Sequence, residues 1–323
     1  MMAFSFRKAA FLVLAMALHG GASGAAVAQE TFKYGSPVNT PNFYLPVLAA
    51  QEQGFFKKNG VKIEWLPSQS GPDMQRAMAA GAIKIASSQT IPDLLSIARG
   101  VPLVIVGQMQ TYDDFALWVS TSGKVKRPED LKGARIGVSR FGGTEHSYAQ
   151  LIASKLGYAK DIQFVATGGI RESLAMLTTG GIDAVVLTIS NLTDLKLQGR
   201  VTEILKVKDY LPKDWLAYTI LASRDFVDKD PETARKIVQS LLEANRYLMD
   251  KGSKDWAVAK IKEMSGYSTE AAELIYGALD LSTDGKVSKT ALDNVAQYMV
   301  DHQQLKASEV PGMEKAFTDK LLK

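Results

Sequence analysis

The chain has 323 residues, no cysteine and a formal net charge of +4 at pH 7. The absence of cysteine excludes disulfide bonds and a lipid-modified cysteine anchor. The small net charge and the scattered lysines argue against binding to nucleic acid, which usually requires a concentrated basic face.

Residues 1–28 have the layout of a cleaved secretory signal peptide. The basic pair Arg7-Lys8 precedes the apolar run AAFLVLAMAL, and small residues follow up to Ala28. Cleavage after Ala28 is expected to leave about 295 residues, enough for one large domain or two lobes. It removes two positive charges and lowers the net charge from +4 to +2. No later segment approaches the roughly 20 apolar residues of a spanning helix, so a free periplasmic protein is expected.

Strand-like and helix-like segments alternate through the first two thirds of the chain. In the first half, strands are predicted at 31–37, 61–67, 83–87 and 101–109, and helices at 45–60, 73–81 and 92–100. In the second half, strands are predicted at 134–139, 162–169 and 182–188, and helices at 144–157, 171–181 and 193–199. This alternation predicts an α/β fold in which crossover helices join parallel strands.

The two halves of this pattern resemble each other. RAMAAGAIKIASS and AMLTTGGIDAVVL align helix, glycine and strand in register. Two similarly built α/β lobes would explain the match. The helix-to-strand pattern that α/β proteins share would also explain it. Both explanations remain open.

The last third of the chain is almost wholly helical. Helices are predicted at 230–252, 255–266, 268–281 and 288–305. Asp230 and Ser268 have the character of helix starts, and Gly252 and Gly266 that of helix stops. This tail is expected to pack on one lobe as scaffold.

Two strand-like stretches, FALWVST and AYTILAS, stand between the halves. They predict two crossings that form a hinge, with a ligand cleft between the lobes. The expected division is a first lobe at 29–119, a second lobe at 120–218, and a return to the first lobe at 219–323.

Ligands of open α/β sheets bind beyond the carboxyl ends of the strands, so the loops that leave a strand and enter a helix are the candidate sites. In the first such loop Asn42 could bond a ligand and Phe43 or Tyr44 could pack on it, or the loop could simply be a capped helix start with a core aromatic residue. In the second loop Ser70 is a candidate contact, although Asp73 is an ordinary helix-start signal.

The third candidate loop is Ser87-Ser88-Gln89-Thr90. Thr90 and Asp93 have the spacing of a capping box. This assignment leaves Ser87, Ser88 and Gln89 without a structural role, which favours ligand contact for all three.

The fourth candidate loop, SRFGGTEHS, joins a strand to a helix. Two glycines allow close approach of the backbone, and the helix start offers free N–H groups to an anion. Glu145 either caps the helix or receives an amine or hydroxyl of a zwitterionic ligand, and Arg140 either adds charge or is an ordinary surface arginine. The candidate contacts in this loop are Ser139, Arg140, Phe141, Gly142, Gly143, Thr144 and Glu145.

Signals of catalysis are few. His146 and His302 are far apart in sequence, and no HExxH, GxSxG or clustered metal-ligand spacing occurs. No metal or cofactor is therefore expected. An acid–base role could fall only to Glu145 and His146.

Several motifs together resemble a known family. LPVLAAQEQGFFKKNGVKIEW, AAGAIKIASSQTIPDLLSIARGVPLVIVG, DLKGARIGVSRFGGT and GGIDAVVLT are similar to periplasmic solute-binding proteins of ABC importers. The resemblance, from Phe32 to Ser223, is to the nitrate/sulfonate/taurine and thiamine-precursor-synthase-like superfamily. It implies a type II periplasmic-binding fold and a membrane permease as partner. It also carries ligand contact onto the loops at Asn42, Ser87 and Ser139 and onto Thr188.

The synthases of that superfamily are enzymes that depend on a histidine and a cysteine-rich motif, and this chain has no cysteine. We therefore expect a non-enzymatic, monomeric receptor that captures a small anionic organic solute for import. The alternatives are a lyase-like periplasmic enzyme on the same fold and a sensor partner that presents its ligand to a membrane receptor.

Overall fold

The structure is a computed structural model that describes residues 30–37, 40–68, 71–112 and 114–323. The predicted signal segment and Ser70 lie outside these residues. Within them, no helix combines the length and the apolar character that crossing a membrane would require.

The first lobe is built on a five-stranded sheet of order β2-β1-β3-β10-β4. Its strands are β1 (Thr31–Pro37), β2 (Lys62–Ser68), β3 (Ile85–Gln89), β4 (Leu103–Gln110) and β10 (Tyr218–Ser223). Its first helices are α1 (Pro41–Glu52), α2 (Phe55–Lys58), α3 (Gly71–Ala79) and α4 (Thr90–Ala98). β1 runs parallel to β2 and β3, whereas β10 is antiparallel to both of its neighbours.

The second lobe repeats this plan with a sheet of order β7-β6-β8-β5-β9. Its strands are β5 (Phe115–Ser120), β6 (Arg135–Val138), β7 (Gln163–Ala166), β8 (Ala184–Thr188) and β9 (Val201–Lys206). Its helices are α5 (Thr144–Lys155), α6 (Ile170–Thr179) and α7 (Ile189–Leu197). In each sheet one antiparallel strand follows a segment that comes from the other lobe. This strand is β10 in the first sheet and β5 in the second. The two sheets therefore have the same strand order and the two lobes are similarly built.

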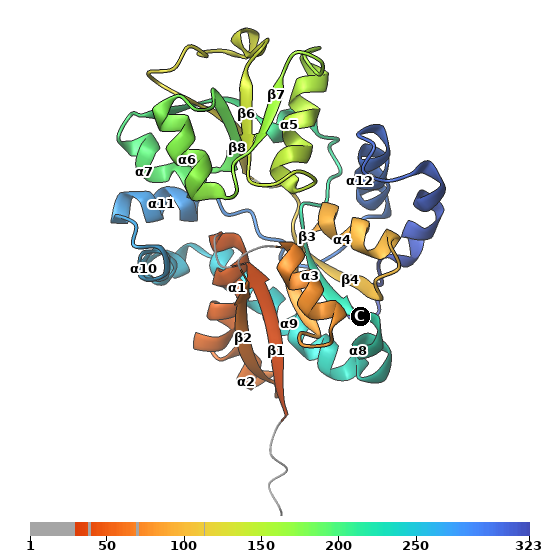
Figure 1. Cartoon of the computed structure of the whole chain (residues 1–323). Coiled ribbons are helices and arrows are strands. Elements are labelled where there is room, and N and C mark those ends of the chain that lie inside the picture. Colours follow the sequence, from red (N-terminus) through yellow and green to blue (C-terminus); the bar gives the residue numbers. More distant parts are fainter. Residues whose placement is uncertain (1–29, 38–39, 69–70, 113) are drawn as a thin grey trace, which may run out of the picture.

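The two lobes lie one above the other in Figure 1, joined by two crossing segments. One crossing lies between β4 and β5, and the other lies between β9 and β10 and includes a short 3-10 turn, Val207–Tyr210. β5 already pairs with β8 and β9, so the chain enters the second sheet at Phe115, ahead of the expected boundary at residue 120. The strand-like stretches FALWVST and AYTILAS are thus sheet members, and the crossings are the polar segments beside them.

The tail folds into α8 (Arg224–Lys229), α9 (Pro231–Met249), α10 (Lys254–Ser265), α11 (Thr269–Gly277) and α12 (Lys289–Asp301). The predicted helix starts are confirmed, because the Asp230 and Ser268 side chains accept from the amides of Thr233 and Ala271. Gly266 ends α10 at φ +71°, a conformation suited to glycine. α9 ends at Met249, ahead of the stop expected at Gly252.

The tail contacts both lobes. α9 packs on α1, but α11 contacts α7 of the second lobe. The Tyr298 hydroxyl on α12 donates to the carbonyl oxygen of Ser147 on α5 (2.5 Å). The expectation that the tail packs on one lobe is therefore wrong, since two tail helices also contact the other.

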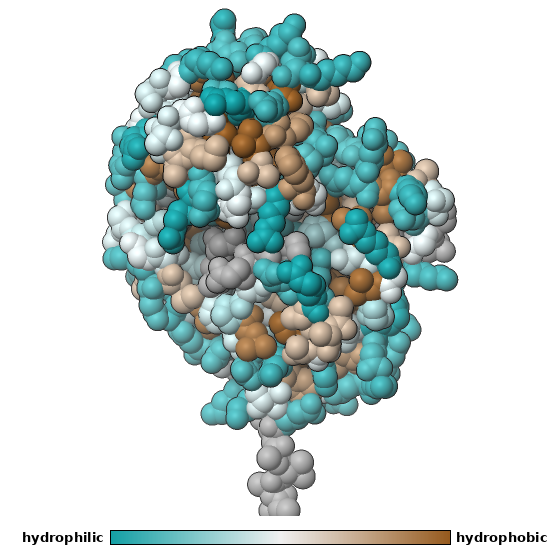
Figure 2. Space-filling view, in the orientation of Figure 1, coloured by the Kyte–Doolittle hydropathy of each residue, from teal (hydrophilic) through white to brown (hydrophobic). Residues whose placement is uncertain are grey.

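The core and the surface follow the usual division by polarity. Every residue of β4 is buried, as are the large side chains of Trp118 and Trp215. On the face seen in Figure 2, hydrophilic residues cover most of the surface and hydrophobic residues occur in small groups.

Candidate functional site

Helices α1, α4, α5 and α7 begin at the carboxyl ends of parallel strands without a side-chain cap, as does α6. The N-cap residues of the first four are Thr40 (α1), Gln89 (α4), Gly143 (α5) and Thr188 (α7), and no cap hydrogen bond forms at any of them. The tail helices α8, α9, α11 and α12 differ, because a Ser or Asp side chain caps each. Of α1, α4, α5 and α7, two come from each lobe. The first amide of α4 donates to the Ala217 carbonyl oxygen and that of α7 to Asp114 Oδ2, and the other amides of the first turns are the groups that an anion could use.

A hydrogen bond joins the two lobes at this edge. The Thr144 hydroxyl on α5 donates to Gln89 Oε1 at the end of β3 (3.0 Å). Gly142 lies at φ +78°, where a side chain would be strained, whereas Gly143 is extended at φ −84° and ψ 174°. The turn therefore needs glycine at position 142 alone, and the glycine pair lies beside the contact between the lobes.

The rest of the SRFGGTEHS turn is held locally. Gly142 N donates to Nδ1 of His146 (3.1 Å), and burial lowers the pKa of that histidine. The Phe141 ring stands against His146 and is nevertheless 61% exposed. Arg140 is exposed, and Ser139 accepts from Gly168 N through its carbonyl oxygen. Burial raises the pKa of Glu145.

The third candidate loop has structural partners that the sequence did not indicate. The Ser87 hydroxyl lies 2.5 Å from the Tyr34 hydroxyl, and Ser88 donates to Asp93 Oδ1 (2.5 Å). Thr90 donates to the carbonyl oxygen of Ala217 (3.1 Å). The predicted capping box is wrong, and so is the interpretation that Ser87 and Ser88 lack a structural role.

Asp93 is the centre of a buried polar cluster. Besides Ser88, its carboxylate accepts from Gln75 Nε2 (2.9 Å) and Thr219 Oγ1 (2.6 Å). Burial raises the pKa of Asp93 to about 6, although these three donors act in the opposite direction. The cluster joins α3, α4, β3 and β10, so it positions the end of β3 on which Gln89 lies.

The first candidate loop supplies both a polar group and an aromatic wall. Asn42 Nδ2 donates to Gln110 Oε1 (2.9 Å), and the Phe43 ring packs on Tyr218 at 4.5 Å. The Tyr44 hydroxyl instead lies 3.1 Å from Ser265 Oγ on α10, and burial raises its pKa to about 12. Tyr44 therefore belongs to the packing of α1 on the tail.

The end of β8 makes a local network. Thr188 Oγ1 donates to Asn191 Oδ1 (2.9 Å) and lies 2.7 Å from Ser190 Oγ. Thr188 pairs in register with Phe115 at the start of β5. This placement brings the predicted contact Thr188 to the first crossing segment.

A cavity of about 660 Å³ opens between the lobes beside this crossing. It is lined by the crossing segment and by parts of β5, α7, β9 and α11: Gln110, Tyr112, Asp114, Phe115, Ala116, Ile189, Lys196, Glu203, Lys206, Lys208, Glu273, Leu274, Gly277, Ala278, Leu279 and Asp280. Its volume is in the range of sites for small organic ligands.

The cavity adjoins the edge of the first sheet on which the predicted residue Gln89 lies. Tyr218 pairs with Gln89 on one side and Gln110 on the other, so Gln89 and Gln110 are about 10 Å apart across two strand spacings. Gln110 lines the cavity and Gln89 bonds Thr144. The start of α5, the sheet edge and the cavity thus form one continuous interlobe region.

Asp114 is the most unusual group in the cavity wall. Its Oδ2 accepts from the amide of Ile189, the first residue of α7 (3.1 Å). Its Oδ1 is buried without a hydrogen-bond partner among the described residues. Burial raises the pKa of Asp114 to about 6.

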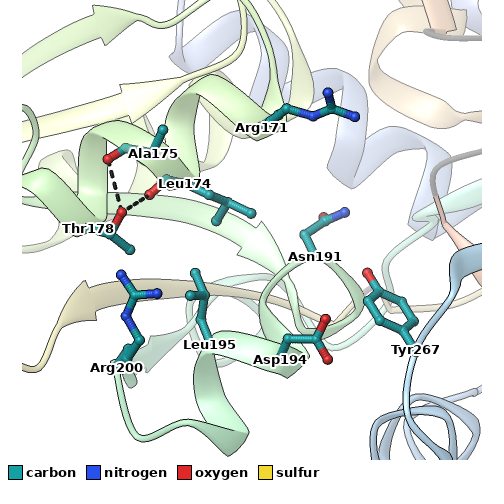
Figure 3. Close-up of a pocket in the computed structure, with 9 residues that line it drawn as sticks. All are labelled: Arg171, Leu174, Ala175, Thr178, Asn191, Asp194, Leu195, Arg200 and Tyr267. Atoms are coloured by element: carbon teal, nitrogen blue, oxygen red, sulfur yellow. Dashed lines mark hydrogen bonds between the residues drawn. The ribbon is translucent and has the colours of Figure 1, made fainter.

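A second cavity, of about 560 Å³, lies between α6 and α7 (Figure 3). Tyr267, from the segment before α11, stands at one end beside Asn191 and Asp194, and its hydroxyl donates to the Ser190 carbonyl oxygen. The Thr178 hydroxyl is already bonded to carbonyl groups of its own helix. This cavity belongs mainly to the surface of the second lobe and does not reach the crossing segment.

The predicted contacts line neither cavity, and the residues that do were missed. Gln110 ends β4, and Tyr112 and Asp114 lie in the crossing segment that follows it. Their signal in the sequence is QMQTYDDF, a polar run between two apolar strands. The predicted sites are loops that lead from a strand into a helix, whereas this run leads from a strand into a strand.

Comparison with known proteins places the chain among solute-binding folds. The periplasmic aliphatic sulphonate-binding protein SsuA of Escherichia coli superposes with a TM-score of 0.77 at 18% identity, over 90% of this chain and 93% of that chain. The periplasmic nitrate-binding protein NrtA of Synechocystis PCC 6803 superposes with a TM-score of 0.71 at 15% identity, over 91% and 87%. These likenesses confirm the predicted type II periplasmic-binding fold.

The sequence relatives are of two kinds. The taurine-binding periplasmic protein of Escherichia coli is 27% identical over 205 residues, 62% of this chain and 61% of that protein. A 4-amino-5-hydroxymethyl-2-methylpyrimidine phosphate synthase of Saccharomyces cerevisiae is 24% identical over 239 residues, 66% of each. The matched segments span less than two thirds of either relative's length. The model of the NMT1/THI5 like family matches residues 41–253, about two thirds of the chain, and the chain therefore belongs to this family.

Proposed function

We propose that this protein binds a small anionic organic solute between its lobes in the periplasm and delivers it to the permease of an ABC importer. The observation that carries the proposal is the meeting of two helix starts without a side-chain cap, α4 of the first lobe and α5 of the second, at the Thr144–Gln89 hydrogen bond. Relatives named for binding taurine, sulphonate and nitrate support it.

The binding energy would come from backbone amides and polar side chains already in place. Each charge-assisted hydrogen bond contributes about 1.5 to 3 kcal/mol. Two or three such bonds, with apolar contact to an aromatic wall such as Phe43, approach the roughly 8 kcal/mol of micromolar binding. Lys196, Lys206 and Lys208 add positive charge to the cavity wall at the second lobe and the second crossing.

Binding is coupled to closure because the solute contacts both lobes. The Thr144–Gln89 bond spans the same gap, so the two lobes meet there through uncharged polar groups. A solute held by amides from both sides favours the closed arrangement by its difference in affinity for the closed and open states.

Lobe closure can be tested with a panel of candidate solutes. A thermal-shift screen of sulfonates, carboxylates, aromatic acids and pyrimidines should yield at least one compound that raises the melting temperature. Small-angle scattering should then show a smaller radius of gyration on adding that compound. Unchanged dimensions at saturation would count against lobe closure.

Thr144→Ala is expected to weaken binding of that compound about 3- to 10-fold, because one hydroxyl at the interlobe edge is lost. The free energy of unfolding of the ligand-free protein should change by less than about 1 kcal/mol. Calorimetric titration and urea denaturation measure the two quantities. Thr179→Ala, which removes a hydroxyl bonded to its own helix, is the matched control and should change neither. A loss of unliganded stability with no loss of affinity would assign Thr144 to structure.

A periplasmic enzyme on the same fold is the competing function, since the yeast relative is named a synthase. Its acid–base group would be Glu145 or His146. The amide of Gly142 already donates to His146 Nδ1, which keeps that nitrogen unprotonated within the turn. Product formation by the wild type that disappears in Glu145→Gln would favour the enzyme, and altered affinity alone would favour the receptor.

A further inference from the structure

The interlobe cavity contains a buried carboxylate that the protein itself satisfies only in part. Asp114 lies in the first crossing segment and lines the cavity. Its Oδ2 accepts from Ile189 N, which leaves Oδ1 buried without a partner among the described residues. A buried ionised oxygen with no donor is costly, so its persistence points to a donor that arrives with a ligand.

The charged groups around the cavity do not supply that donor. Those that line it are Lys196, Lys206, Lys208, Glu203, Glu273 and Asp280. Lys206 lies 3.9 Å from Glu203, and Lys196 stands over the Trp118 ring at 5.6 Å. The charge that acts on Asp114 is that of Glu203, which, like burial, opposes ionisation.

The signs of charge in the wall fit a ligand with two unlike ends. Lys196 on α7 and Lys206 on β9 belong to the second lobe, and Lys208 lies in the second crossing segment. Asp114 stands at the crossing, where the start of α7 meets β5. An anionic group can face the lysines or a free helix start while a nitrogen donor faces Asp114.

We propose that Asp114 selects a solute that carries a protonated amine in addition to its anionic group. The proposal rests on the proposed function and narrows its ligand class from anions to zwitterions. Because Asp114 lies in a crossing segment, the separation of the lobes that admits a solute also uncovers the carboxylate. Closure then buries the new ion pair.

The experiment uses matched ligand pairs that differ only in the amine. The probes are taurine with ethanesulfonate, 4-(aminomethyl)benzenesulfonate with 4-methylbenzenesulfonate, and β-alanine with propanoate. Calorimetric titration at pH 7.5 should give at least one pair in which the amine compound binds about 10- to 100-fold more tightly. Asp114→Asn should lower the affinity for the amine compound to that for the matched compound without the amine. The asparagine oxygen can still accept from Ile189 N.

The pH profile is a second measurement on the unaltered protein. Asp114, with its pKa of about 6, is ionised at pH 7.5 and mostly protonated at pH 5, whereas the amine and the sulfonate keep their charges. Binding of the amine sulfonate should weaken about 10-fold between these pH values in the wild type. In Asp114→Asn it should be unchanged.

Asp293→Asn is the matched control, because Asp293 is an exposed carboxylate paired with Lys289 on α12 and does not line the cavity. It should preserve the preference for the amine. A preference for the compound without the amine, or equal effects of both substitutions, overturns the role of Asp114 while the binding function stands. If no probe binds at 10 mM, the result contradicts both the role of Asp114 and the proposed binding of sulfonates and carboxylates.

Discussion

Gly143→Asp is expected to weaken binding of an anionic solute at least about 100-fold and to leave the protein folded. The new carboxylate would sit at the N-cap of α5, accept from the free amides of the first turn and repel the anion. Position 143 is extended, and a Cβ there would lie 3.5 Å from its nearest neighbour, the Arg140 carbonyl oxygen. The substitution therefore changes the electrostatics of the helix start without strain.

Two variants separate the causes of that loss. Gly143→Ala adds the same Cβ without a cap and should weaken binding less than about 3-fold. Gly143→Asn caps the helix without charge and should give an intermediate loss. Calorimetric titration with the best compound of the thermal-shift screen measures all three. If Gly143→Asp binds as the wild type does, the start of α5 is not part of the ligand site.

Asp93→Ala is expected to lower the free energy of unfolding by about 3 kcal/mol at pH 7.5. The alanine leaves Gln75, Ser88 and Thr219 without their shared acceptor in a fully buried site. Urea denaturation measures the change. Asp293→Ala, which removes an exposed carboxylate paired with Lys289 on α12, should change it by less than about 0.5 kcal/mol.

The loss in free energy of unfolding caused by Asp93→Ala should grow as the pH falls. The pKa of Asp93 in the folded protein, about 6, lies above the ordinary value of 3.8, so the folded state binds more protons between these values. Its contribution to stability therefore rises as the pH falls from 7 toward 4, by about 1 kcal/mol between pH 7 and pH 5. Asp93→Asn keeps an acceptor for Gln75 and Ser88 and should lose less than Asp93→Ala. A deficit that shrinks on acidification would contradict the buried, protonatable carboxylate.

Most of the helices and strands were predictable from the sequence because their signals are local, whereas β9 (Val201–Lys206) was not predicted. Apolar runs bounded by glycine identified the parallel strands, and Asp230 and Ser268 cap helices through amides three residues away. The same local logic failed for Thr90 and Asp93. Their spacing matches a capping box, but Asp93 bonds Thr219, which lies 126 positions along the chain.

The sequence by itself determined the α/β alternation and the loops at the carboxyl ends of the strands, since hydrophobic period and turn chemistry act over a few residues. Only the tertiary structure decided which polar side chains are already paired and which remain available. Thr144 meets Gln89 across 55 positions, and Asp114 reaches Ile189 across 75. Those meetings depend on how the chain crosses twice between two sheets, and no local pattern encodes which groups burial brings together.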